Sequence, residues 1–129
     1  TRGPGKFSVS NPDPVAQARF AAALEEIASV GVPAINASIA GKISRIIDLA
    51  DEFGLTVTSP RADAERAGIA VVQPAPDHLT ALAAALHNHG ITATVRADHA
   101  RLSAHVSTDD ETFAMLGAAF RAFATTVTR

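Results

Sequence analysis

Proline and glycine interrupt this chain at regular intervals, and their placement constrains the fold more than any other feature of the sequence. The interruptions fall at residues 11–14, 31–33, 54, 74–77 and 90. Proline lacks a backbone donor and glycine readily takes left-handed backbone angles, so both residues tend to end helices and strands. The chain is therefore predicted to form a succession of short helices and strands.

The first half of the chain is predicted to form an extended lead-in over residues 1–12, followed by two helices. Asp13 is placed to cap the first helix, Pro14 fits its first position, and apolar residues continue at helical spacing to about Val30. The second helix is expected over residues 33–53, because isoleucines and alanines form one apolar stripe that ends at Gly54.

The second half of the chain has the β-branched and alternating segments that indicate strands. Strands are predicted at residues 55–58, 68–72, 91–96 and 101–106, with a helix from residue 79 to Gly90. A last helix should open with a capping box of Thr108 and Glu111. The order β-β-α-β-β-α predicts an α/β (α+β) fold, with a mainly antiparallel sheet of about four strands and helices on one face.

Composition excludes several classes of function. The 129 residues are 47% hydrophobic and 19% charged, which is typical of one folded domain over residues 1–129. The net charge is −2 and the basic residues are scattered, so no nucleic-acid partner is expected. The absence of cysteine excludes disulfides and favours a cytoplasmic protein. No apolar run approaches the roughly 18 residues of a membrane span, so no membrane partner or signal peptide is expected.

The usual catalytic and metal motifs are missing. His87 and His89 lie two residues apart on a predicted helix and point in different directions, so no metal site is expected. Ser103, His105 and Asp109 could be written as a catalytic triad, but the sequence around Ser103 has no nucleophile elbow. Glycine-rich phosphate loops are also absent. We therefore expect no catalytic residue within this chain.

Arg101 is the strongest candidate for ligand binding. On the predicted strand 101–106 it alternates with apolar residues and shares a polar face with Ser103 and His105. A guanidinium can bind a carboxylate through two parallel charge-assisted hydrogen bonds, and these neighbours could add donors. The alternative is that Arg101 pairs with a nearby acidic residue on the surface, and periodicity alone leaves both interpretations open.

Two segments together resemble a known family. They are Gly-Ile-Thr-Ala-Thr-Val-Arg at residues 90–96 and Arg-Leu-Ser-Ala-His-Val-Ser-Thr-Asp-Asp-Glu at residues 101–111. They resemble the C-terminal small domain of class V aminotransferases, the pyridoxal-phosphate fold-type I group that includes cysteine desulfurases, isopenicillin-N-epimerase-like proteins and kynureninase. Residues 6–12 and the helix after them are also similar to the start of that domain, so the resemblance covers nearly the whole chain.

The resemblance implies roles for individual residues. The family's arginine in the Arg-x-Ser element binds the α-carboxylate of the amino-acid substrate, and here that position is Arg101. Arg96 matches a second family arginine, and Ser103 and His105 occupy neighbouring substrate-binding positions. Two departures are visible: Ala104 replaces the usual proline, and a Tyr-Asn-Thr sequence is shortened to residues 107–108.

The resemblance also implies a cofactor and partners. Such enzymes hold pyridoxal 5'-phosphate on a lysine of a large domain, whereas the lysines here are Lys6 and Lys42, in other sequence contexts. We therefore expect this chain to be the small domain of a longer, homodimeric enzyme that acts on an amino acid as a transaminase, C–S lyase, desulfurase or epimerase. Alone it is expected to be inactive. The alternative is a stand-alone α/β module that binds a small ligand or a protein without this cofactor.

Overall fold

The computed structural model describes residues 3–8 and 10–129, and the chain divides into an N-terminal unit, Thr1–Ile35, and a C-terminal unit, Asn36–Arg129. The N-terminal unit holds a short 3-10 helix, η1 (Pro4–Phe7), helix α1 (Pro14–Val30) and the first residues of helix α2 (Val32–Glu52). None of the residues of α1 is buried.

Helix α1 begins and ends where the sequence predicts. The carboxylate of Asp13 accepts hydrogen bonds from the backbone N–H groups of Val15 and Ala16, at 3.0 and 3.1 Å. Gly31 follows the helix with a φ of 94°, a backbone angle that favours glycine. These contacts satisfy backbone groups that the helix ends would otherwise leave without partners.

The extended lead-in predicted for residues 1–12 is wrong at its start. Pro4–Phe7 form a 3-10 turn, in which the N–H of Lys6 donates to the carbonyl of Gly3 at 3.3 Å. Proline favours such a turn because its φ is already fixed near the helical value. Residues 1–2 and 9 of the predicted segment lie outside the described residues.

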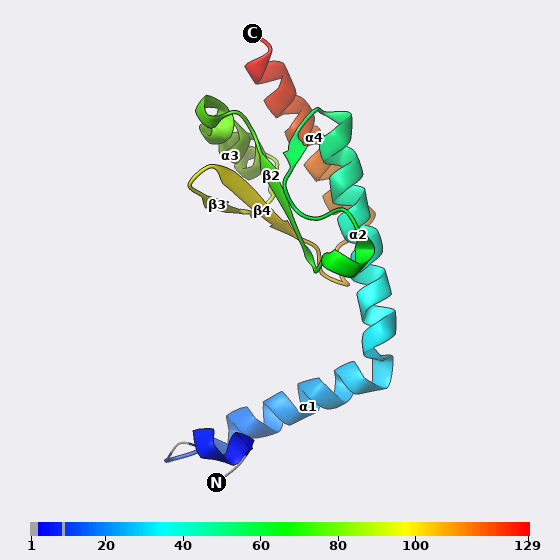
Figure 1. Ribbon diagram of the computed structural model, residues 1–129, viewed down its shortest axis with the longest axis vertical. Helices are drawn as coiled ribbons and strands as arrows, with labels where there is room; N and C mark the ends of the chain where they lie inside the picture. The colour runs from blue at the N-terminus through cyan, green and yellow to red at the C-terminus, as the bar shows by residue number, and fades with distance from the viewer. Residues whose placement is uncertain (1–2, 9) are drawn as a thin grey trace. The chain divides into compact units, whose positions relative to one another are not determined.

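The C-terminal unit contains the predicted four-stranded antiparallel sheet. Its strands are β1 (Thr56–Val57), β2 (Ile69–Gln73), β3 (Thr94–Arg96) and β4 (His99–Ser103), in the spatial order β1-β2-β4-β3. The long central pair, β2 and β4, runs side by side in Figure 1. The predicted fold class and the antiparallel arrangement are therefore confirmed.

The predicted strand 101–106 is wrong at both ends. Pairing already starts at His99, because β3 and β4 are joined by a turn of only two residues in which Arg96 faces His99. The strand stops at Ser103, because the next backbone groups fold into a turn. There the N–H of His105 donates to Oγ1 of Thr108, and the N–H of Thr108 donates back to the carbonyl of His105.

Three helices supply the other side of the core of this unit: α2, α3 (Leu79–Asn88) and α4 (Asp110–Val127). Alternate residues of β2 and β4 are buried with them, namely Ala70, Val72, Ala100 and Leu102. The largest fully buried side chains are Phe120, Ile43, Leu82, Leu86 and Val72. Removing each such side chain from water stabilises the fold by about 1.5–3 kcal/mol. No helix in the described part of the chain is long and apolar enough to cross a membrane.

The N-cap of helix α4 lies one residue later than predicted. Asp109, and not Thr108, is the N-cap, because its carboxylate accepts a hydrogen bond from the N–H of Thr112 at 2.9 Å. Thr108 is engaged in the preceding turn instead. The capping box predicted for Thr108 and Glu111 is therefore corrected to a single cap by Asp109.

Polar contacts fix α2 to its neighbours at the surface. Arg45 pairs with Asp110 at 2.8 Å, and its guanidinium carbon lies 3.9 Å from the centre of the Phe113 ring on α4. Arg61 makes two hydrogen bonds to the carboxylate of Asp51, at 2.7 and 2.8 Å. This hydrogen bonding lowers the pKa of Asp51 below its ordinary value. The two arginines thus join α2 to α4 and to the loop after β1.

Truncating Phe120 to alanine tests the core. Phe120 is fully buried, so Phe120→Ala should lower the free energy of unfolding by about 3–5 kcal/mol. Urea unfolding followed by circular dichroism measures the change. Phe7→Ala is the control, because Phe7 is 75% exposed and should change the stability by less than about 0.5 kcal/mol. Equal effects of the two substitutions would contradict the described core.

Candidate functional site

The sheet presents polar side chains on the face opposite the core. Successive residues of a strand point to opposite sides, so the burial of Ala100 and Leu102 turns their neighbours outward. We call this the outer face, and it comprises Ile69, Val71, Gln73, Thr94, Arg96, His99, Arg101 and Ser103. Arg101 lies in its middle strand, opposite Val71 on one side and Thr94 on the other.

Arg101 is exposed and is not neutralised within the structure. Among the described residues, no acidic oxygen lies within 4.0 Å of its guanidinium, whereas Arg45, Arg61 and Arg66 all have such partners. Val71 and Thr94 flank it without bearing a charge. The guanidinium is therefore free to bind an external carboxylate through two hydrogen bonds.

Arg96 adds a second guanidinium to the outer face. The two-residue turn, in which Ala97 has a φ of 36°, sets a register that places Arg96 opposite His99. Arg101 follows His99 by two residues, so the two arginines are diagonal neighbours, roughly 7–8 Å apart at their backbones. In the described part of the chain Arg96 also lacks an ion pair. The outer face therefore carries two uncompensated positive charges close together.

The acidic residue of the same hairpin, Asp98, is directed to other groups. Its carboxylate lies 2.8 Å from Nδ1 of His99 and accepts a hydrogen bond from Nε2 of Gln73 at 2.7 Å. The hydrogen bond with His99 is the main reason that the pKa of Asp98 lies below its ordinary value. Asp98 thus anchors the hairpin to β2 and leaves the arginines unpaired.

Two further residues were predicted for the site: Ser103 lies beside Arg101, and His105 does not. Ser103 is exposed on the outer face two residues from Arg101. His105 lies in the turn after β4, with its Nδ1 atom 2.9 Å from Oγ of Ser107 and accepting the N–H of Ser107 at 3.3 Å. The carboxylate of Asp109 is bonded to Thr112. No hydrogen bond joins Ser103, His105 and Asp109, so they do not form a triad.

Lys42 contributes to this region in a way that the sequence analysis missed. Its Nζ atom donates hydrogen bonds to the carbonyl oxygens of His105, at 3.1 Å, and of Val106, and so holds the turn after β4 against α2. The sequence did contain a signal for this role, because Lys42 is a lone lysine within the apolar stripe of the helix predicted over residues 33–53. The same contacts make Lys42 a poor fit for a covalent link to pyridoxal phosphate. Lys6 lies in the 3-10 turn Pro4–Phe7, with its Nζ atom 4.8 Å from the ring centre of Phe7.

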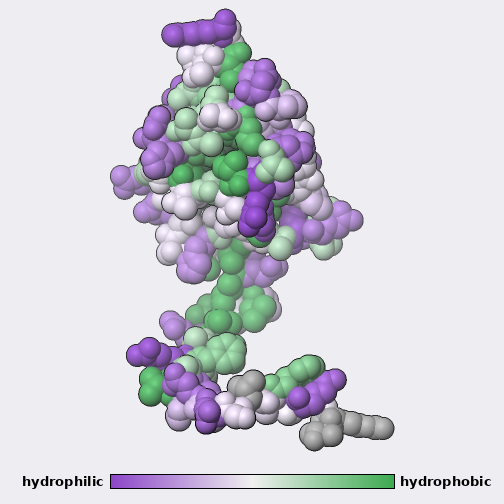
Figure 2. Space-filling view, turned by 90° about the vertical axis from the view of Figure 1, so that its left-hand side faces the viewer, coloured by the Kyte–Doolittle hydropathy of each residue, from purple (hydrophilic) through white to green (hydrophobic). Residues whose placement is uncertain are grey.

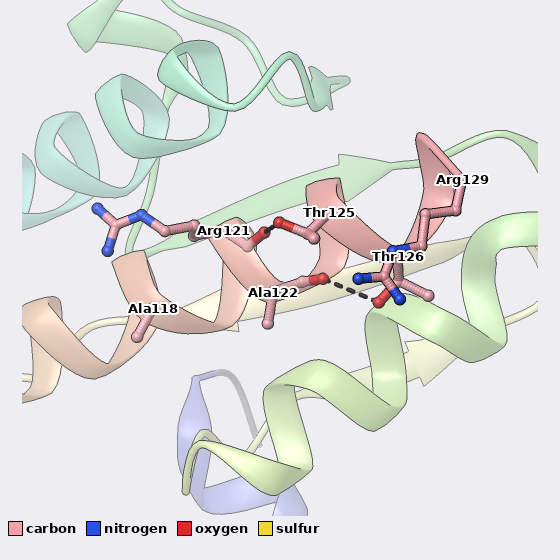
Figure 3. Close-up of a pocket in the computed structure, with 6 residues that line it drawn as sticks. All are labelled: Ala118, Arg121, Ala122, Thr125, Thr126 and Arg129. Carbon is pink, nitrogen blue, oxygen red and sulfur yellow. Dashed lines mark hydrogen bonds between the residues drawn. The ribbon is translucent and has the colours of Figure 1, made fainter.

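Two hollows in the C-terminal unit lack the features of a reaction site. A cavity of about 110 Å³ near Ser103 is lined by residues of α2, β4, α4 and the segments 90–92 and 104–108, and none of its lining residues is charged. The other lies along one helix, α4, and Figure 3 shows Thr125 and Thr126 there donating to the carbonyls of Arg121 and Ala122 at 3.0 and 2.9 Å. Because both hydroxyls are bonded to their own helix, this second hollow offers few free polar groups.

The outer face is the best candidate for a functional site, because neither a metal site in the described part of the chain nor a similar protein points elsewhere. Among the described residues, no three His, Asp or Glu side chains gather as a metal site would require. Comparison with protein-family models, curated proteins and solved structures gives no match for this chain. The residues of the outer face are therefore the basis on which a function can be proposed.

Replacing Lys42 by methionine tests its role in the turn after β4. Lys42→Met keeps the length of the side chain but removes both hydrogen bonds, so the amides of His105 and Thr108 should exchange with solvent faster. Hydrogen exchange measured by NMR provides the readout. Lys6→Met is the matched control and should leave these amides unchanged. Unchanged exchange in Lys42→Met would show that the turn is held by other contacts.

The N-cap of α4 should make stability depend on pH. Hydrogen bonds from the N–H and the hydroxyl of Thr112 lower the pKa of Asp109 below its ordinary value. The cap should therefore contribute its full stabilisation above that ordinary value, near 3.9, and lose it as the pH falls through the lower pKa of the folded state.

Thermal unfolding across this pH range measures the contribution of the cap. Asp109→Ala should lower the unfolding temperature at neutral pH, and its difference from the wild type should shrink in acid. Asp109→Asn keeps an acceptor without an acidic group, so its stability should decline less in acid. A difference between wild type and Asp109→Ala that is constant with pH would contradict this account.

Proposed function

We propose that this chain is the substrate-carboxylate-binding small domain of a pyridoxal-phosphate enzyme that resembles class V aminotransferases and acts on an amino acid. The observation that carries the proposal is the position of Arg101, which lies exposed on the outer face without an acidic partner in the described part of the chain. Arg19, Arg121 and Arg129 also lack an ion pair among the described residues, and Arg101 differs from them in lying on the sheet, one strand from Arg96 and two residues from Ser103.

The chain's own part in the activity is to bind and orient. Arg101 donates two N–H groups to the carboxylate of the substrate, which fixes both its position and its rotation. Arg96 raises the positive potential of the same face. The hydroxyl of Ser103, two residues along the strand, supplies a further hydrogen-bond donor for the substrate. The turn held by Lys42 borders this region. We place His105 at its edge because its ring is already bonded to Ser107.

The cofactor belongs, in this proposal, to a part of the enzyme outside this chain. Neither lysine here fits the covalent link, because Lys42 is bonded to backbone carbonyls and Lys6 lies against Phe7. The homodimeric state, the cytoplasmic location and the choice among transaminase, lyase, desulfurase and epimerase follow from the family resemblance and stand as proposals with it.

The same lysine contacts favour a second candidate function. A stand-alone module could use Arg101 and Arg96 to bind an acidic ligand without any pyridoxal phosphate. Cofactor absorbance of the natural, full-length gene product distinguishes the two. Bound pyridoxal phosphate supports the enzyme, and a natural product without it supports the module.

Removing the guanidinium of Arg101 tests the carboxylate site itself. The 129-residue chain should bind amino acids and simple carboxylates weakly, and Arg101→Ala should reduce the affinity by about tenfold or more, because a hydrogen bond to a charged group contributes about 1.5–3 kcal/mol. NMR titration that follows the Nε–H signals of the arginines measures this change. Arg101→Lys should recover only part of the affinity, since an ammonium lacks the two-pronged geometry.

The matched control is Arg121→Ala, which removes an arginine from the helical layer. Arg121 lies on α4 beside the ring of Phe53 and away from the outer face. Its loss should leave carboxylate binding unchanged. Equal losses in the two variants would indicate nonspecific attraction, and an unchanged affinity in Arg101→Ala would refute the assignment.

A further inference from the structure

Helix α1 carries an exposed apolar stripe. Phe20 is 67% exposed, Leu24 50%, Ile27 44% and Val30 60%. Figure 2 shows hydrophobic side chains at the surface of the N-terminal unit. Apolar residues that cluster on one side of an exposed helix commonly mark an interaction surface.

The spacing of the stripe is that of a coiled-coil seam. Ala16, Phe20, Ala23, Ile27 and Val30 follow one another at intervals of four, three, four and three residues. These intervals place them at the core positions of a seven-residue repeat, in which two helices interlock their side chains. Arg19 and Glu26 then occupy the same flanking position in successive repeats, on one edge of the seam.

We propose that α1 pairs in an antiparallel manner with α1 of a second copy of this chain, with Phe20 opposite Ala23 of the second copy. The two-fold symmetry of such a pair repeats every contact. The occupant of the stripe is thus the same stripe on another molecule. The choice of partner, direction and register follows from the sizes and charges of the residues involved.

Side-chain size favours this register. With Phe20 opposite Ala23 of the second copy, Ile27 falls opposite Ala16 of the second copy, so the large residues of the central layers each meet a small one. Val30 falls opposite Asp13, the N-cap of the second copy's helix, so the seam ends at the layer of Ile27 and Ala16. Alternating large and small residues across a seam fill the space evenly. In a parallel, in-register pair, Phe20 would meet Phe20 and Ala23 would meet Ala23, which alternates crowded layers with empty ones.

Charge favours the same register. In antiparallel pairs, equivalent flanking positions face each other, so Arg19 lies beside Glu26 of the second copy and Glu26 beside Arg19 of the second copy. A shift of seven residues in either direction would place Arg19 against Arg19 or Glu26 against Glu26. In a parallel pair Arg19 would face Leu24 and gain no opposite charge. One arrangement alone satisfies both size and charge.

The paired segment is short, which sets the expected strength. Helix α1 has 17 residues, or between two and three repeats, whereas sustained coiled coils have at least three to four. We therefore expect a reversible dimer whose population rises with concentration, and not a permanent one. Pairing would also shield Phe20 and Ile27, which the single copy leaves in water.

Charge exchange tests the pairing in the intact 129-residue chain. Sedimentation equilibrium should detect dimers of the wild type, and Arg19→Glu and Glu26→Arg should each raise the dissociation constant by about tenfold, since each places like charges at both symmetric contacts. The double variant Arg19→Glu/Glu26→Arg restores opposite charges and should return within about threefold of the wild type. Glu25→Arg is the matched control, because Glu25 lies on the outer side of α1 and should have no effect.

Size exchange gives a second, independent test. Phe20→Ala alone should weaken the dimer, whereas Phe20→Ala/Ala23→Phe moves the large residue to the facing position and should restore it. Phe20 and Ala23 are both exposed in the single copy, and α1 has no buried residue. The unfolding temperature of the C-terminal unit should therefore not change. That measurement separates loss of pairing from loss of folding.

Three results would overturn the inference: a monomer at every concentration, a dimer insensitive to Arg19→Glu and Glu26→Arg, or a double variant that fails to restore pairing. Each would assign the stripe to a different occupant or direction. The pairing does not depend on the proposed carboxylate site. Arg101→Ala should leave the dimer unchanged, and Arg19→Glu should leave carboxylate binding unchanged, so the two proposals can fail separately.

Discussion

The burial of one side of β4 under the helices is the constraint on which the site depends. Ala100 and Leu102 are almost completely removed from water, and their burial fixes the strand so that it cannot shift by one residue without exposing the core. Arg101 must then project from the opposite side. The position of the candidate ligand-binding group is thus a consequence of hydrophobic packing. The same burial that stabilises the core also sets the geometry of the outer face.

Local hydrogen bonding decides which charges remain available. Asp98 and the surface arginines Arg45 and Arg61 all have partners, so their charges are compensated within the structure. Such exposed pairs contribute little to stability individually, but they determine where uncompensated charge is left. In the described part of the C-terminal unit, the arginines without an ion pair are Arg96 and Arg101 on the outer face and Arg121 and Arg129 in and after α4. The N-terminal unit differs in kind, because α1 exposes apolar side chains at coiled-coil spacing.

Much of the fold could be predicted because its signals are local. The N-cap at Asp13, the four-stranded antiparallel sheet and the helices on one face follow from capping chemistry, proline and glycine placement and hydrophobic periodicity. The errors lie at element ends, as at His105 and Thr108, where hydrogen bonds between a turn and its surroundings compete with continuation of a strand. A sequence pattern contains no measure of that competition.

The sequence alone determined that Arg101 and Ser103 share one side of a strand, because alternation is a property of the backbone, and it also placed Phe20 and Ile27 on one side of a helix. Only the tertiary structure decided that Arg101 has no acidic partner among the described residues and that Lys42 is bonded to the carbonyls of the turn after β4. These facts depend on contacts between residues far apart in the chain. Periodicity identifies the face of an element, and packing determines what lies against it.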